Sequence, residues 1–571
     1  MTVQKPTPNP WIRTQPYQVP RHPASISLKL DSNEGKAPPQ AILKSVESLT
    51  TEQLLRYPNP ARLESLLAAR FGIHQKSVLL TAGGDEGLMR MCRAFLGPGR
   101  NMIFPEPSFE MIRRFAEDTQ AEVRTVPYPA RGYPTDAVIS KCDEHTAVIA
   151  VVSPNNPTGG VITKDDLLRL SKAVPQAMLM LDLAYVEFAE HDLTDTALEL
   201  SNVVIFRTFS KAFGLAGLRV GYAMGPERWI TLLRSVGLPY PVSQTALRLA
   251  ECCLGLSEDR DNTVRKLRSF RQTIAATLSK CNIQSHPSQA NFVFSTGVDG
   301  SWWRDAMAGL GIGIRAWPGH QTLKQAIRIS CPTNTEDTTR LCRAIETISS
   351  PQALIFDMDG VLADVARSYR AAIVRTARHF GAEIAASDIE RIKSNGDANN
   401  DWVVTWRLLA EQDIAVSLES VTDVFEQLYQ GIGTKEGLYK KERFIGNAEV
   451  LAHLGQRYKL GIVTGRPRQD AERFLRDFGL IDRFETVICM EDAPCKPSPK
   501  PVYRALEAMG VDRAWMLGDT PDDMVAAREA GVLPIGVVPP GVTAEPLGTT
   551  LLQSGASIVL EQWDSILGRL P

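Results

Sequence analysis

Short apolar runs recur in both halves of this chain, and each run is followed by a polar segment and then by a helical pattern. Such runs are typical of strands in a parallel sheet that is covered by helices. In these sheets ligands bind beyond the carboxyl ends of the strands, where the polar segments lie. The sequence therefore predicts an α/β fold with its chemistry at strand ends. The runs are residues 148–152, 178–181, 203–206, 353–356, 460–463 and 515–517.

The length of the chain predicts more than one domain. It has 571 residues, whereas ordinary domains have roughly 100 to 200 residues. The junction Ser349-Ser350-Pro351 between the two halves is short. We expect an N-terminal arm at residues 1–25, a first domain at 26–350 and a second domain at 351–571, whose helical insert spans about 365–443.

Composition and charge exclude several classes of protein. The chain is 44% hydrophobic with a formal net charge of -2, so it lacks the basic excess of a nucleic-acid-binding surface. The N-terminal stretch has no apolar core of a signal peptide or membrane helix. Nine cysteines without CxxC spacing argue against a disulfide framework or a zinc site. We expect a cytoplasmic protein that binds neither nucleic acid nor membranes.

Lys211 is the first candidate for chemistry, because it lies in a turn just after the run 203–206. A lysine at a strand end can form a Schiff base when its pKa falls well below the roughly 10.4 of a free side chain. Taken alone, a lysine is more commonly solvated. The neighbouring Thr208, Ser210 and Arg219 favour the functional interpretation, because together they could grip a phosphate.

A second anion-binding element comes earlier in the chain. Gly83-Gly84-Asp85-Glu86 precedes a helical run, and the amide groups at a helix N-terminus attract anions. The glycine pair is a weak signal by itself, and Asp85 is also a plausible helix cap.

Two further strand ends supply what a pyridine ring needs. Asp182 follows the run 178–181, and a carboxylate that faces the ring nitrogen keeps it protonated. Asn156 and Tyr185 could bind the ring hydroxyl, and Phe109 could stack on the ring. Each residue also has an ordinary interpretation as a turn, a cap or a core aromatic. Their occurrence in this order predicts a pyridoxal phosphate site.

On these motifs, residues 26 to about 348 resemble the fold-type I pyridoxal phosphate aminotransferases, and more narrowly the histidinol-phosphate aminotransferases. The resemblance implies a large sheet domain plus a small domain. It also implies that Lys211 holds the cofactor and carries the proton at the substrate, and that Tyr57 reaches the cofactor phosphate of a neighbouring subunit in a homodimer. The implied cofactor-binding residues are Gly84, Asp85, Glu86, Phe109, Asn156, Asp182, Tyr185, Thr208, Ser210, Arg219 and Tyr57.

The same resemblance implies a substrate site at Asn33 and Arg328, with Arg315 as a second guanidinium. Arg328 would hold the α-carboxylate of glutamate or the phosphate of histidinol phosphate by a two-pronged hydrogen bond. An arginine on a strand is more often a surface salt-bridge partner, and that alternative stays open for Arg315. The chain departs from the family at Gly35-Lys36-Ala37-Pro38 and at Leu183, which weakens the prediction of the substrate. Aromatic amino acid aminotransferases and a threonine-phosphate decarboxylase share the same cofactor residues.

Asp357 and Asp359 open the second half, directly after the run 353–356. Two carboxylates this close repel each other unless a cation joins them, and Mg²⁺ would do so while shielding a phosphate. One carboxylate could then attack phosphorus while the other handles the proton of the leaving group. Asp-x-Asp alone is equally compatible with a solvated acidic turn.

Four more residues follow at later strand ends, in the order Thr464, Lys496, Asp519 and Asp523. With Asp357 and Asp359 they resemble the haloacid dehalogenase superfamily, whose fold is a Rossmann-like core with a helical cap. The resemblance implies Asp357 as nucleophile, Asp359 as general acid and base, and Thr464 and Lys496 as phosphate ligands. The implied magnesium ligands are Asp357, Asp359, Asp519 and Asp523, although Asp523 also fits a helix start.

The sequence thus predicts two enzymes on one chain that act on small molecules. The leading hypothesis is transamination between histidinol phosphate and 2-oxoglutarate, joined to magnesium-dependent hydrolysis of a phosphate monoester such as histidinol phosphate. One alternative is another aminotransferase, for aromatic or other amino acids, with a phosphatase for an unrelated ester such as phosphoglycolate. Another is a second domain that only binds or dimerises.

Overall fold

The computed structural model describes residues 7, 9–12, 16, 22–394, 396 and 400–571. Most of the predicted N-terminal arm, and residues 395 and 397–399 of the predicted cap, lie outside the described residues. The chain forms two compact units that do not coincide with its two halves. Unit 1 contains Leu30–Gly300 and Arg315–Thr339, and unit 2 contains Arg21–Lys29, Ser301–Ile314 and Arg340–Pro571.

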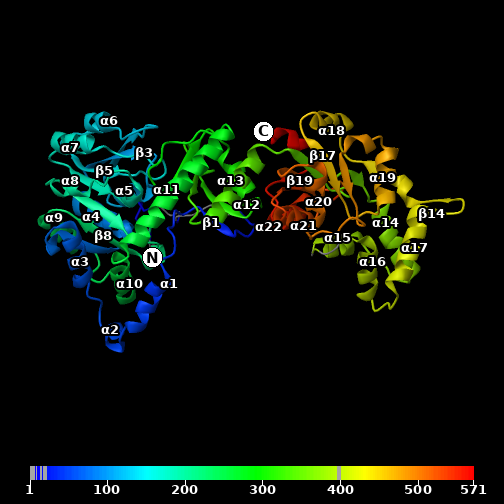
Figure 1. Cartoon of the computed structure of the whole chain (residues 1–571), viewed down its shortest axis with the longest axis horizontal. Coiled ribbons are helices and arrows are strands. Elements are labelled where there is room, and N and C mark those ends of the chain that lie inside the picture. Colours follow the sequence, from blue (N-terminus) through cyan, green and yellow to red (C-terminus); the bar gives the residue numbers. More distant parts are fainter. Residues whose placement is uncertain (1–6, 8, 13–15, 17–21, 395, 397–399) are drawn as a thin grey trace, which may run out of the picture. The chain divides into compact units, whose positions relative to one another are not determined.

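Unit 1 is built on a seven-stranded sheet with the strand order β2-β8-β7-β6-β5-β3-β4 (Figure 1). All neighbours pair in parallel except β8, which is antiparallel to β2 and β7. The carboxyl ends of β5, β6 and β7 therefore meet at one edge of the sheet. The strands are β2 (Val78–Ala82), β3 (Asn101–Glu106), β4 (Glu122–Pro127), β5 (Thr146–Val152), β6 (Met178–Asp182), β7 (Val203–Thr208) and β8 (Val220–Met224).

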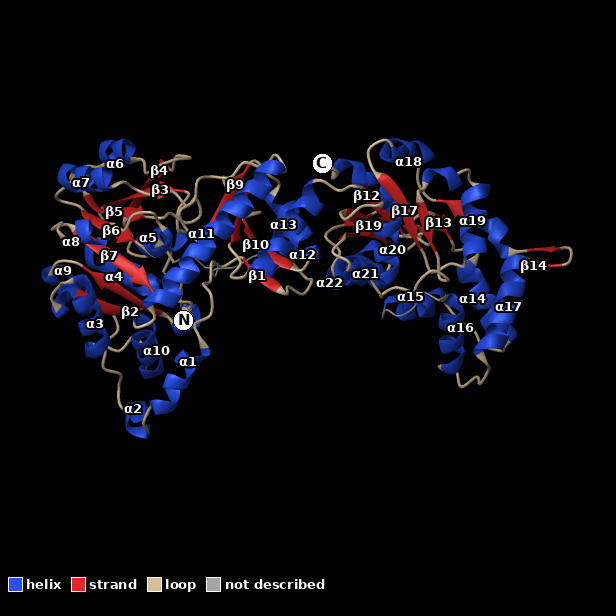
Figure 2. Cartoon of the chain, in the orientation of Figure 1, coloured by secondary structure: helices blue, strands red, loops and turns tan. Residues whose placement is uncertain are grey.

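Helices α4, α5 and α9 cover one face of this sheet (Figure 2). Met91 of α4, Ile112 of α5 and Ile230 of α9 are fully buried against strand residues such as Phe104 and Phe206. Burying a side chain of this size contributes about 1.5–3 kcal/mol. The helices of this part are α1 (Gln40–Lys44), α2 (Thr51–Leu55), α3 (Ala61–Phe71), α4 (Gly83–Phe95), α5 (Glu110–Glu117), α6 (Thr135–Lys141), α7 (Lys164–Ala173), α8 (Thr194–Leu198), α9 (Glu227–Ser235), α10 (Gln244–Leu254) and α11 (Ser257–Lys280).

A smaller sheet follows, with the strand order β1-β10-β11-β9. Arg315 of β10 and Arg328 of β11 are direct cross-strand partners in its antiparallel ladder. The elements are β1 (Leu28–Leu30), β9 (Phe292–Thr296), α12 (Gly300–Gly309), β10 (Ile312–Ala316), β11 (Ala326–Ser330) and α13 (Thr335–Ser349).

The core of unit 2 is a six-stranded parallel sheet with the strand order β18-β17-β12-β19-β20-β21. Its central strand β12 ends at Phe356, directly before Asp357. The core elements are β12 (Ala353–Phe356), α18 (Ala448–Gly455), β17 (Lys459–Val463), α19 (Arg468–Asp477), β18 (Thr486–Ile488), α20 (Lys500–Met509), β19 (Ala514–Gly518), α21 (Pro521–Glu529), β20 (Leu533–Val537), α22 (Ala544–Ser554) and β21 (Val559–Leu560). The alternation of strands and helices in both units confirms the predicted α/β class.

A helical cap is inserted between the two short antiparallel strands β13 (Ala363–Asp364) and β16 (Arg443–Phe444). We call these two paired strands the hinge, because the chain enters the cap after β13 and returns to the core through β16. The cap elements are α14 (Tyr369–His379), α15 (Ala386–Ser394), α16 (Asp401–Ala410), α17 (Leu418–Gln430), β14 (Gly431–Ile432) and β15 (Lys435–Glu436).

Unit 2 also includes residues that precede its sheet, and Trp515 of β19 connects them to the core. Trp515 is fully buried, and its indole Nε1 donates to the carbonyl oxygen of Thr347 in α13 at 2.7 Å. The ring of Trp302 in α12 lies 5.4 Å from the Trp515 ring, measured between centroids. The core of unit 2 therefore begins before β12.

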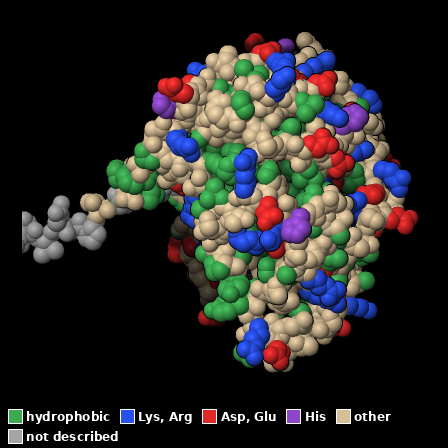
Figure 3. Space-filling view, turned by 90° about the vertical axis from the view of Figure 1, so that its left-hand side faces the viewer, with side chains coloured by type: hydrophobic (Ala, Val, Ile, Leu, Met, Phe, Trp, Pro, Cys, Tyr) green, Lys and Arg blue, Asp and Glu red, His purple; other side chains and the backbone are tan. Residues whose placement is uncertain are grey.

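The surface and the helices agree with the composition. Basic and acidic side chains are interspersed on the face of the molecule drawn in Figure 3, without a large area of one sign. Among the described residues, no helix combines the length and the apolar character that are needed to cross a membrane.

Candidate active sites

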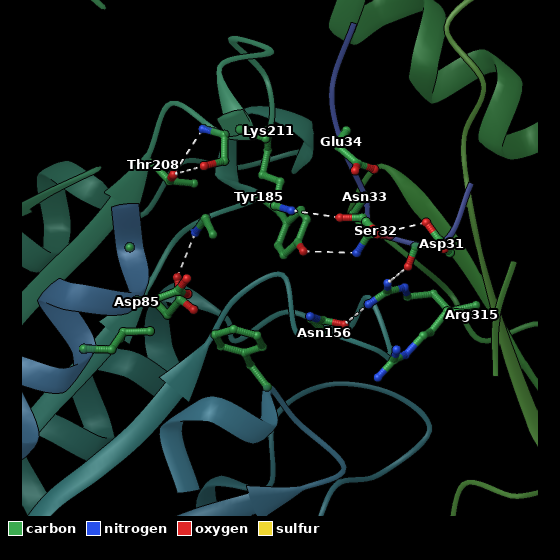
Figure 4. A pocket seen from close by; sticks show the side chains of 18 of the residues that line it. Asp31, Ser32, Asn33, Glu34, Asp85, Asn156, Tyr185, Thr208, Lys211 and Arg315 are labelled. Atoms are coloured by element: carbon green, nitrogen blue, oxygen red, sulfur yellow. Dashed lines mark hydrogen bonds between the residues drawn. The ribbon is translucent and has the colours of Figure 1, made fainter. Parts of the chain in front are cut away.

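A cavity of about 420 Å³ lies at the carboxyl edge of the large sheet in unit 1 (Figure 4). It gathers residues from strand ends, from the start of α4 and from the segment 31–34. The lining residues are Asp31, Ser32, Asn33, Glu34, Gly84, Asp85, Leu88, Phe109, Asn156, Asp182, Ala184, Tyr185, Thr208, Ser210, Lys211, Ala216, Arg219, Arg315 and Arg328.

One end of the cavity has the features of a phosphate cradle. The Thr208 hydroxyl donates to Ser210 Oγ at 2.9 Å, and the Nη1 atom of the Arg219 guanidinium lies 3.5 Å from the same oxygen. Arg219 also pairs with Asp85 Oδ2 at 2.8 Å. Gly83 has a φ of +76°, and a Cβ atom there would collide with the Arg219 guanidinium. Hydroxyls, a guanidinium and the N-terminus of α4 thus converge on one point, and they fit the phosphate of pyridoxal phosphate.

Lys211 reaches into the cavity toward the segment 31–34 (Figure 4). Its Nζ donates to the carbonyl oxygen of Ser32 at 3.2 Å and lies 5.5 Å from the centroid of the Tyr185 ring. Figure 4 shows the lysine amine within the cavity, on the same side as Tyr185 and Asn33. No described acidic side chain forms an ion pair with this amine, so it is available to a carbonyl group.

Asp182 ends β6 and is buried at the floor of the cavity. Burial raises the pKa of its carboxyl group to about 7, and the charge of Asp85 adds to that rise. The backbone amide of Ala184 and the charge of Lys211 act in the opposite direction. A buried carboxyl of this kind favours a cationic partner, and a protonated pyridine nitrogen is one.

Two sets of hydrogen bonds hold side chains in the middle of the cavity. The Asn33 amide donates to the Tyr185 hydroxyl at 3.1 Å, and Ser330 Oγ donates to Asn33 Oδ1 at 2.8 Å. Asn156 Oδ1 accepts from Arg328 at 2.5 Å. These hydrogen bonds hold Tyr185 and Asn156 in the part of the cavity between Lys211 and Arg315 (Figure 4).

Arg315 and Arg328 place two guanidinium groups at the other end of the cavity. As cross-strand partners they extend from the same face of the small sheet. Both guanidinium carbons lie near the Trp317 ring, at 5.5 and 5.9 Å from its centroid. Arg328 also donates to the carbonyl oxygen of Asp31 at 2.6 Å. Paired guanidinium groups favour a dianion over a single carboxylate.

Two residues that the sequence predicts for the cofactor site lie outside the residues that line this cavity. The carboxylate of Glu86 accepts from the Ala82 amide at 2.6 Å and pairs with buried Arg90 at 2.6 Å. Tyr57 is 79% exposed and stacks on Tyr240, with ring centroids 4.6 Å apart.

The second site lies at the carboxyl ends of β12 and β19 in unit 2. Oxygen atoms of Asp357, Asp519 and Asp523 lie within 4.8 Å of one another, close enough to share one metal ion. Lys496 Nζ donates to Asp357 Oδ1 at 2.6 Å and contacts Asp523. A Cβ atom at Gly360, where φ is +79°, would collide with the Asp519 carboxylate. An oxygen cluster of this kind fits Mg²⁺.

The electrostatics of this cluster favour a bound cation. Burial raises the pKa of the Asp357 carboxyl, the charges of Asp523 and Asp359 add to the rise, and Lys496 opposes it. Burial also raises the pKa of Asp519, followed by the charges of Asp357 and Asp523. A divalent ion would remove this repulsion and let all three carboxylates ionise.

Asp523 has a structural role besides its place in the cluster. Its Oδ2 accepts from the Thr520 backbone at 3.0 Å and from the Thr520 hydroxyl at 2.7 Å, in the capping box that begins α21. The predicted helix start is therefore confirmed, and it leaves Oδ1 to face Lys496.

Asp359 lies outside the three-carboxylate cluster, because its Oδ1 accepts from Arg466 Nε at 2.6 Å. Arg466 is the second residue after Thr464, whose hydroxyl oxygen accepts from the Arg466 amide at 3.2 Å. Thr464 is buried beside these groups, at the carboxyl end of β17.

A cavity of about 460 Å³ opens next to Asp519 and carries cap and core residues together. Its polar wall comes from the cap and its apolar wall from the segment around α22. The lining residues are Arg370, Ser387, Glu390, Arg391, Lys393, Asp519, Thr520, Pro521, Pro539, Val542, Thr543, Pro546, Leu547 and Thr550.

Sequence reasoning missed several residues at these sites. Ser32 acts only through its backbone oxygen, which no side-chain pattern reveals. Arg466 and Glu442 form a buried ion pair at 3.0 Å although they lie 24 residues apart. The signal that was available was the position of Arg466, two residues after the predicted phosphate ligand Thr464.

Comparison with protein families separates the chain into two parts. Residues 26–345 match the model of aminotransferase class I and II. Residues 354–537 match the model of haloacid dehalogenase-like hydrolase.

Among curated proteins, a histidinol-phosphate aminotransferase of Cereibacter sphaeroides is 36% identical over 284 residues, which are 48% of this chain and 78% of that protein. An aromatic amino acid aminotransferase of Corynebacterium glutamicum is 32% identical over 347 residues, covering 59% of this chain and 98% of that protein. An imidazoleglycerol-phosphate dehydratase of Phytophthora nicotianae is 45% identical over 230 residues, 37% of this chain. The chain spans about half of that last relative, 51% of its length.

Among solved structures, a histidinol-phosphate aminotransferase from Sinorhizobium meliloti in complex with pyridoxal-5'-phosphate matches with a TM-score of 0.55 and 23% identity. The match covers 61% of this chain and 100% of that one. At this identity the similarity shows the fold, and it confirms the predicted aminotransferase fold of the first part.

Proposed function

The chain belongs to the class I and II aminotransferases through residues 26–345 and carries a haloacid dehalogenase-like hydrolase domain at residues 354–537, and from this premise we propose that it is a bifunctional enzyme. The first site transaminates between histidinol phosphate and 2-oxoglutarate with pyridoxal phosphate. The second site hydrolyses a phosphate monoester with Mg²⁺, and histidinol phosphate is the leading substrate.

In the first site, pyridoxal phosphate supplies an electron sink for the bond that breaks at the substrate α-carbon. Lys211 Nζ would hold the cofactor and then move the proton of that carbon. Thr208, Ser210 and Arg219 would hold the phosphate, as the convergence of their side chains supports. Buried Asp182 would keep the ring nitrogen protonated.

The observation that carries the choice of substrate is the pair of guanidinium groups at the end of the cavity opposite the cradle, on Arg315 and Arg328. A phosphate ester is a dianion at neutral pH and would engage both, whereas the α-carboxylate of glutamate carries a single charge and needs only one guanidinium. The 36% identity to a histidinol-phosphate aminotransferase supports the same choice.

A second candidate for the first site is an aromatic amino acid. The relative from Corynebacterium glutamicum, named an aromatic amino acid aminotransferase, aligns over 98% of its own length. Phe109 lines the main cavity, and Phe109 and Trp317 also line a smaller cavity beside the two arginines, where an aromatic side chain would find contacts.

In the second site, Mg²⁺ would bind to Asp357, Asp519 and Asp523 and neutralise charge on the phosphate. Asp357 would attack phosphorus, and Asp359 would hold the proton for the leaving group. Lys496 and Thr464 would bind phosphate oxygens. The name of the Phytophthora relative refers to an imidazole-bearing phosphate ester, which supports an ester of that class. A smaller ester such as phosphoglycolate, or a domain without activity, is the alternative.

A homodimer is part of the proposal, with Tyr57 reaching the site of the neighbouring subunit. Tyr57 and Tyr240 are exposed and stacked on each other, and the exposed Leu54, Leu55 and Leu238 add apolar area. A second copy would cover these side chains. All nine cysteines are free, which supports a reducing compartment such as the cytoplasm.

The test is a paired assay of the purified full-length protein with pyridoxal phosphate, Mg²⁺ and histidinol phosphate. We expect 2-oxoglutarate-dependent transamination and release of inorganic phosphate. Lys211→Ala should abolish the first activity together with the absorption band of the bound cofactor and leave phosphate release intact. Asp357→Asn should do the reverse. Absence of phosphate release from histidinol phosphate, alongside hydrolysis of phosphoglycolate, would show that the two sites act on unrelated substrates.

A further inference from the structure

The buried guanidinium of Arg466 connects Asp359 to the hinge of the cap. Arg466 is 1% exposed. Its Nε donates to Asp359 Oδ1 at 2.6 Å, and its Nη1 donates to Glu442 Oε2 at 3.0 Å. The Tyr369 and Phe474 rings lie 4.9 and 5.3 Å from its guanidinium carbon. A planar cation between two carboxylates and two aromatic rings is held in one orientation.

Glu442 belongs to the hinge, because it directly precedes β16, the strand through which the chain leaves the cap. Its Oε1 accepts from the Tyr429 hydroxyl of α17 at 2.9 Å. Tyr429 is fully buried, and the Glu442 side chain is 4% exposed. An unbroken series of polar contacts thus leads from the cap helix through Glu442 and Arg466 to Asp359.

Arg466 binds only one oxygen of Asp359. Both Nε and Nη2 of the guanidinium lie 2.6 Å from Oδ1, and no hydrogen bond joins Oδ2 to another described residue. The Asp359 side chain remains 28% exposed. One oxygen is therefore fixed while the other is open to the ester, which is the arrangement that proton transfer to a leaving group needs.

We propose that Arg466 is a positioning residue that orients Asp359 for proton transfer. Through its contact with Glu442, and from there with Tyr429, this orientation depends on the position of the cap at the hinge. The inference rests on the phosphatase activity proposed above. In the step concerned, an Asp357 oxygen forms a bond to phosphorus. The bond between phosphorus and the ester oxygen breaks, its electron pair stays on that oxygen, and the oxygen takes the proton from Asp359. Water then attacks phosphorus and releases phosphate from Asp357, and Asp359 takes the proton of that water, in a step common to every ester.

The leaving group distinguishes this role from a purely structural ion pair. An alkoxide is a poor leaving group and needs the proton, whereas 4-nitrophenolate leaves without one. The quantity to compare is kcat/KM, which reports the transfer of the phosphoryl group to Asp357 and not the later hydrolysis that all esters share. In Arg466→Lys, kcat/KM for alkyl phosphates should fall by about 100-fold, the lower range for loss of general acid catalysis. For 4-nitrophenyl phosphate kcat/KM should fall by less than about 3-fold, because its transfer to Asp357 does not use the acid.

Two further variants test the series of contacts. Tyr429→Phe removes only the hydroxyl that contacts Glu442 and should give the same dependence on the leaving group with a smaller loss. In the Asp359→Asn background, Arg466→Lys should add no further loss on alkyl phosphates, because the residue that it orients is already without function.

Arg468→Lys is the matched control. Arg468 lies two residues after Arg466 and pairs with Asp492 at 2.5 Å and with Glu472 at 3.5 Å, so it is a neighbouring ion-paired arginine outside the series of contacts that leads to Asp359. Its ratio of alkyl to aryl phosphate hydrolysis should equal that of the wild type. Thermal unfolding of the metal-free variants measures any loss of stability separately from activity.

An equal loss of kcat/KM on both esters in Arg466→Lys, with or without a lower unfolding temperature, would overturn the positioning role. Unchanged kinetics in Arg466→Lys would do the same. If the wild-type protein hydrolyses neither ester, the proposed phosphatase itself is wrong, and that result is distinguishable because it precedes any mutation.

Discussion

At the scale of single residues, Asp182 shows how the fold prepares a site at the expense of stability. Burial raises the pKa of its carboxyl to about 7 in the folded chain, while an unfolded aspartate titrates near about 3.9. As pH rises between these values, the unfolded state releases its proton first. The free energy of unfolding of the cofactor-free protein therefore falls from about pH 4 to pH 7.

Asp182→Asn should remove this penalty. At pH 8 the cofactor-free variant should be more stable than the cofactor-free wild type by a few kcal/mol, on the order of the pKa difference. It should also bind pyridoxal phosphate more weakly, because the ring nitrogen loses its anionic partner. Urea unfolding at pH 5 and pH 8 measures the first effect. A wild type whose stability does not change with pH would contradict the pKa argument.

At the scale of elements, the antiparallel register of β10 and β11 decides which arginines meet. Arg315 opposes Arg328 directly, and a shift by one residue would turn Arg315 to the other face of the sheet. The pair is therefore a property of the register rather than of either strand alone.

Arg315→Gln should lower kcat/KM for histidinol phosphate about 10- to 100-fold, since one charged hydrogen-bond donor to the phosphate is lost. Transamination of glutamate, which needs only Arg328, should change by less than about 3-fold by the same reasoning. Steady-state kinetics with both amino donors checks this, and Lys324→Gln on the loop between the strands serves as control. Equal losses for both donors would contradict the division of labour.

The elements also show how far the sequence could predict the sites. Asn156, Asp182 and Lys211 follow apolar strands, and the parallel order of the sheet brings them to one cavity, so order along the chain was sufficient. Glu442 could not be found in this way. Its contact with Arg466 depends on the path of the chain back from the cap, and no periodic pattern encodes that path.

At the scale of the whole molecule, each site is complete within its own unit. The residues that line the first cavity all belong to unit 1, and the three clustered carboxylates belong to unit 2. The unit boundary nevertheless differs from the end of the aminotransferase match at residue 345, because residues 340–349 of α13 belong to unit 2.

This boundary predicts the effect of truncation. A fragment of residues 351–571 lacks Thr347 and Trp302, so the buried indole N–H of Trp515 loses its acceptor. Compared with residues 334–571, which keep α13, its free energy of unfolding should be lower by about 1–3 kcal/mol, the cost of an unsatisfied buried donor. Circular dichroism melts of the two fragments measure the difference. Equal melting temperatures would mean that α13 contributes nothing to this core.

Lys496 places a positively charged ammonium group within the carboxylate cluster of the second site. Since it contacts both Asp357 and Asp523, the cluster keeps a resident positive charge when divalent ions are scarce. Chelation should therefore stop hydrolysis and lower the melting temperature of wild-type unit 2 by less than that of Lys496→Met, whose cluster has no cation left to offset the carboxylates. Melting curves with Mg²⁺ and with a chelator measure the difference, and equal shifts in the two proteins would contradict this role of Lys496. The second domain would therefore stay folded but inactive when the ion is depleted, and it would become active again when the ion returns.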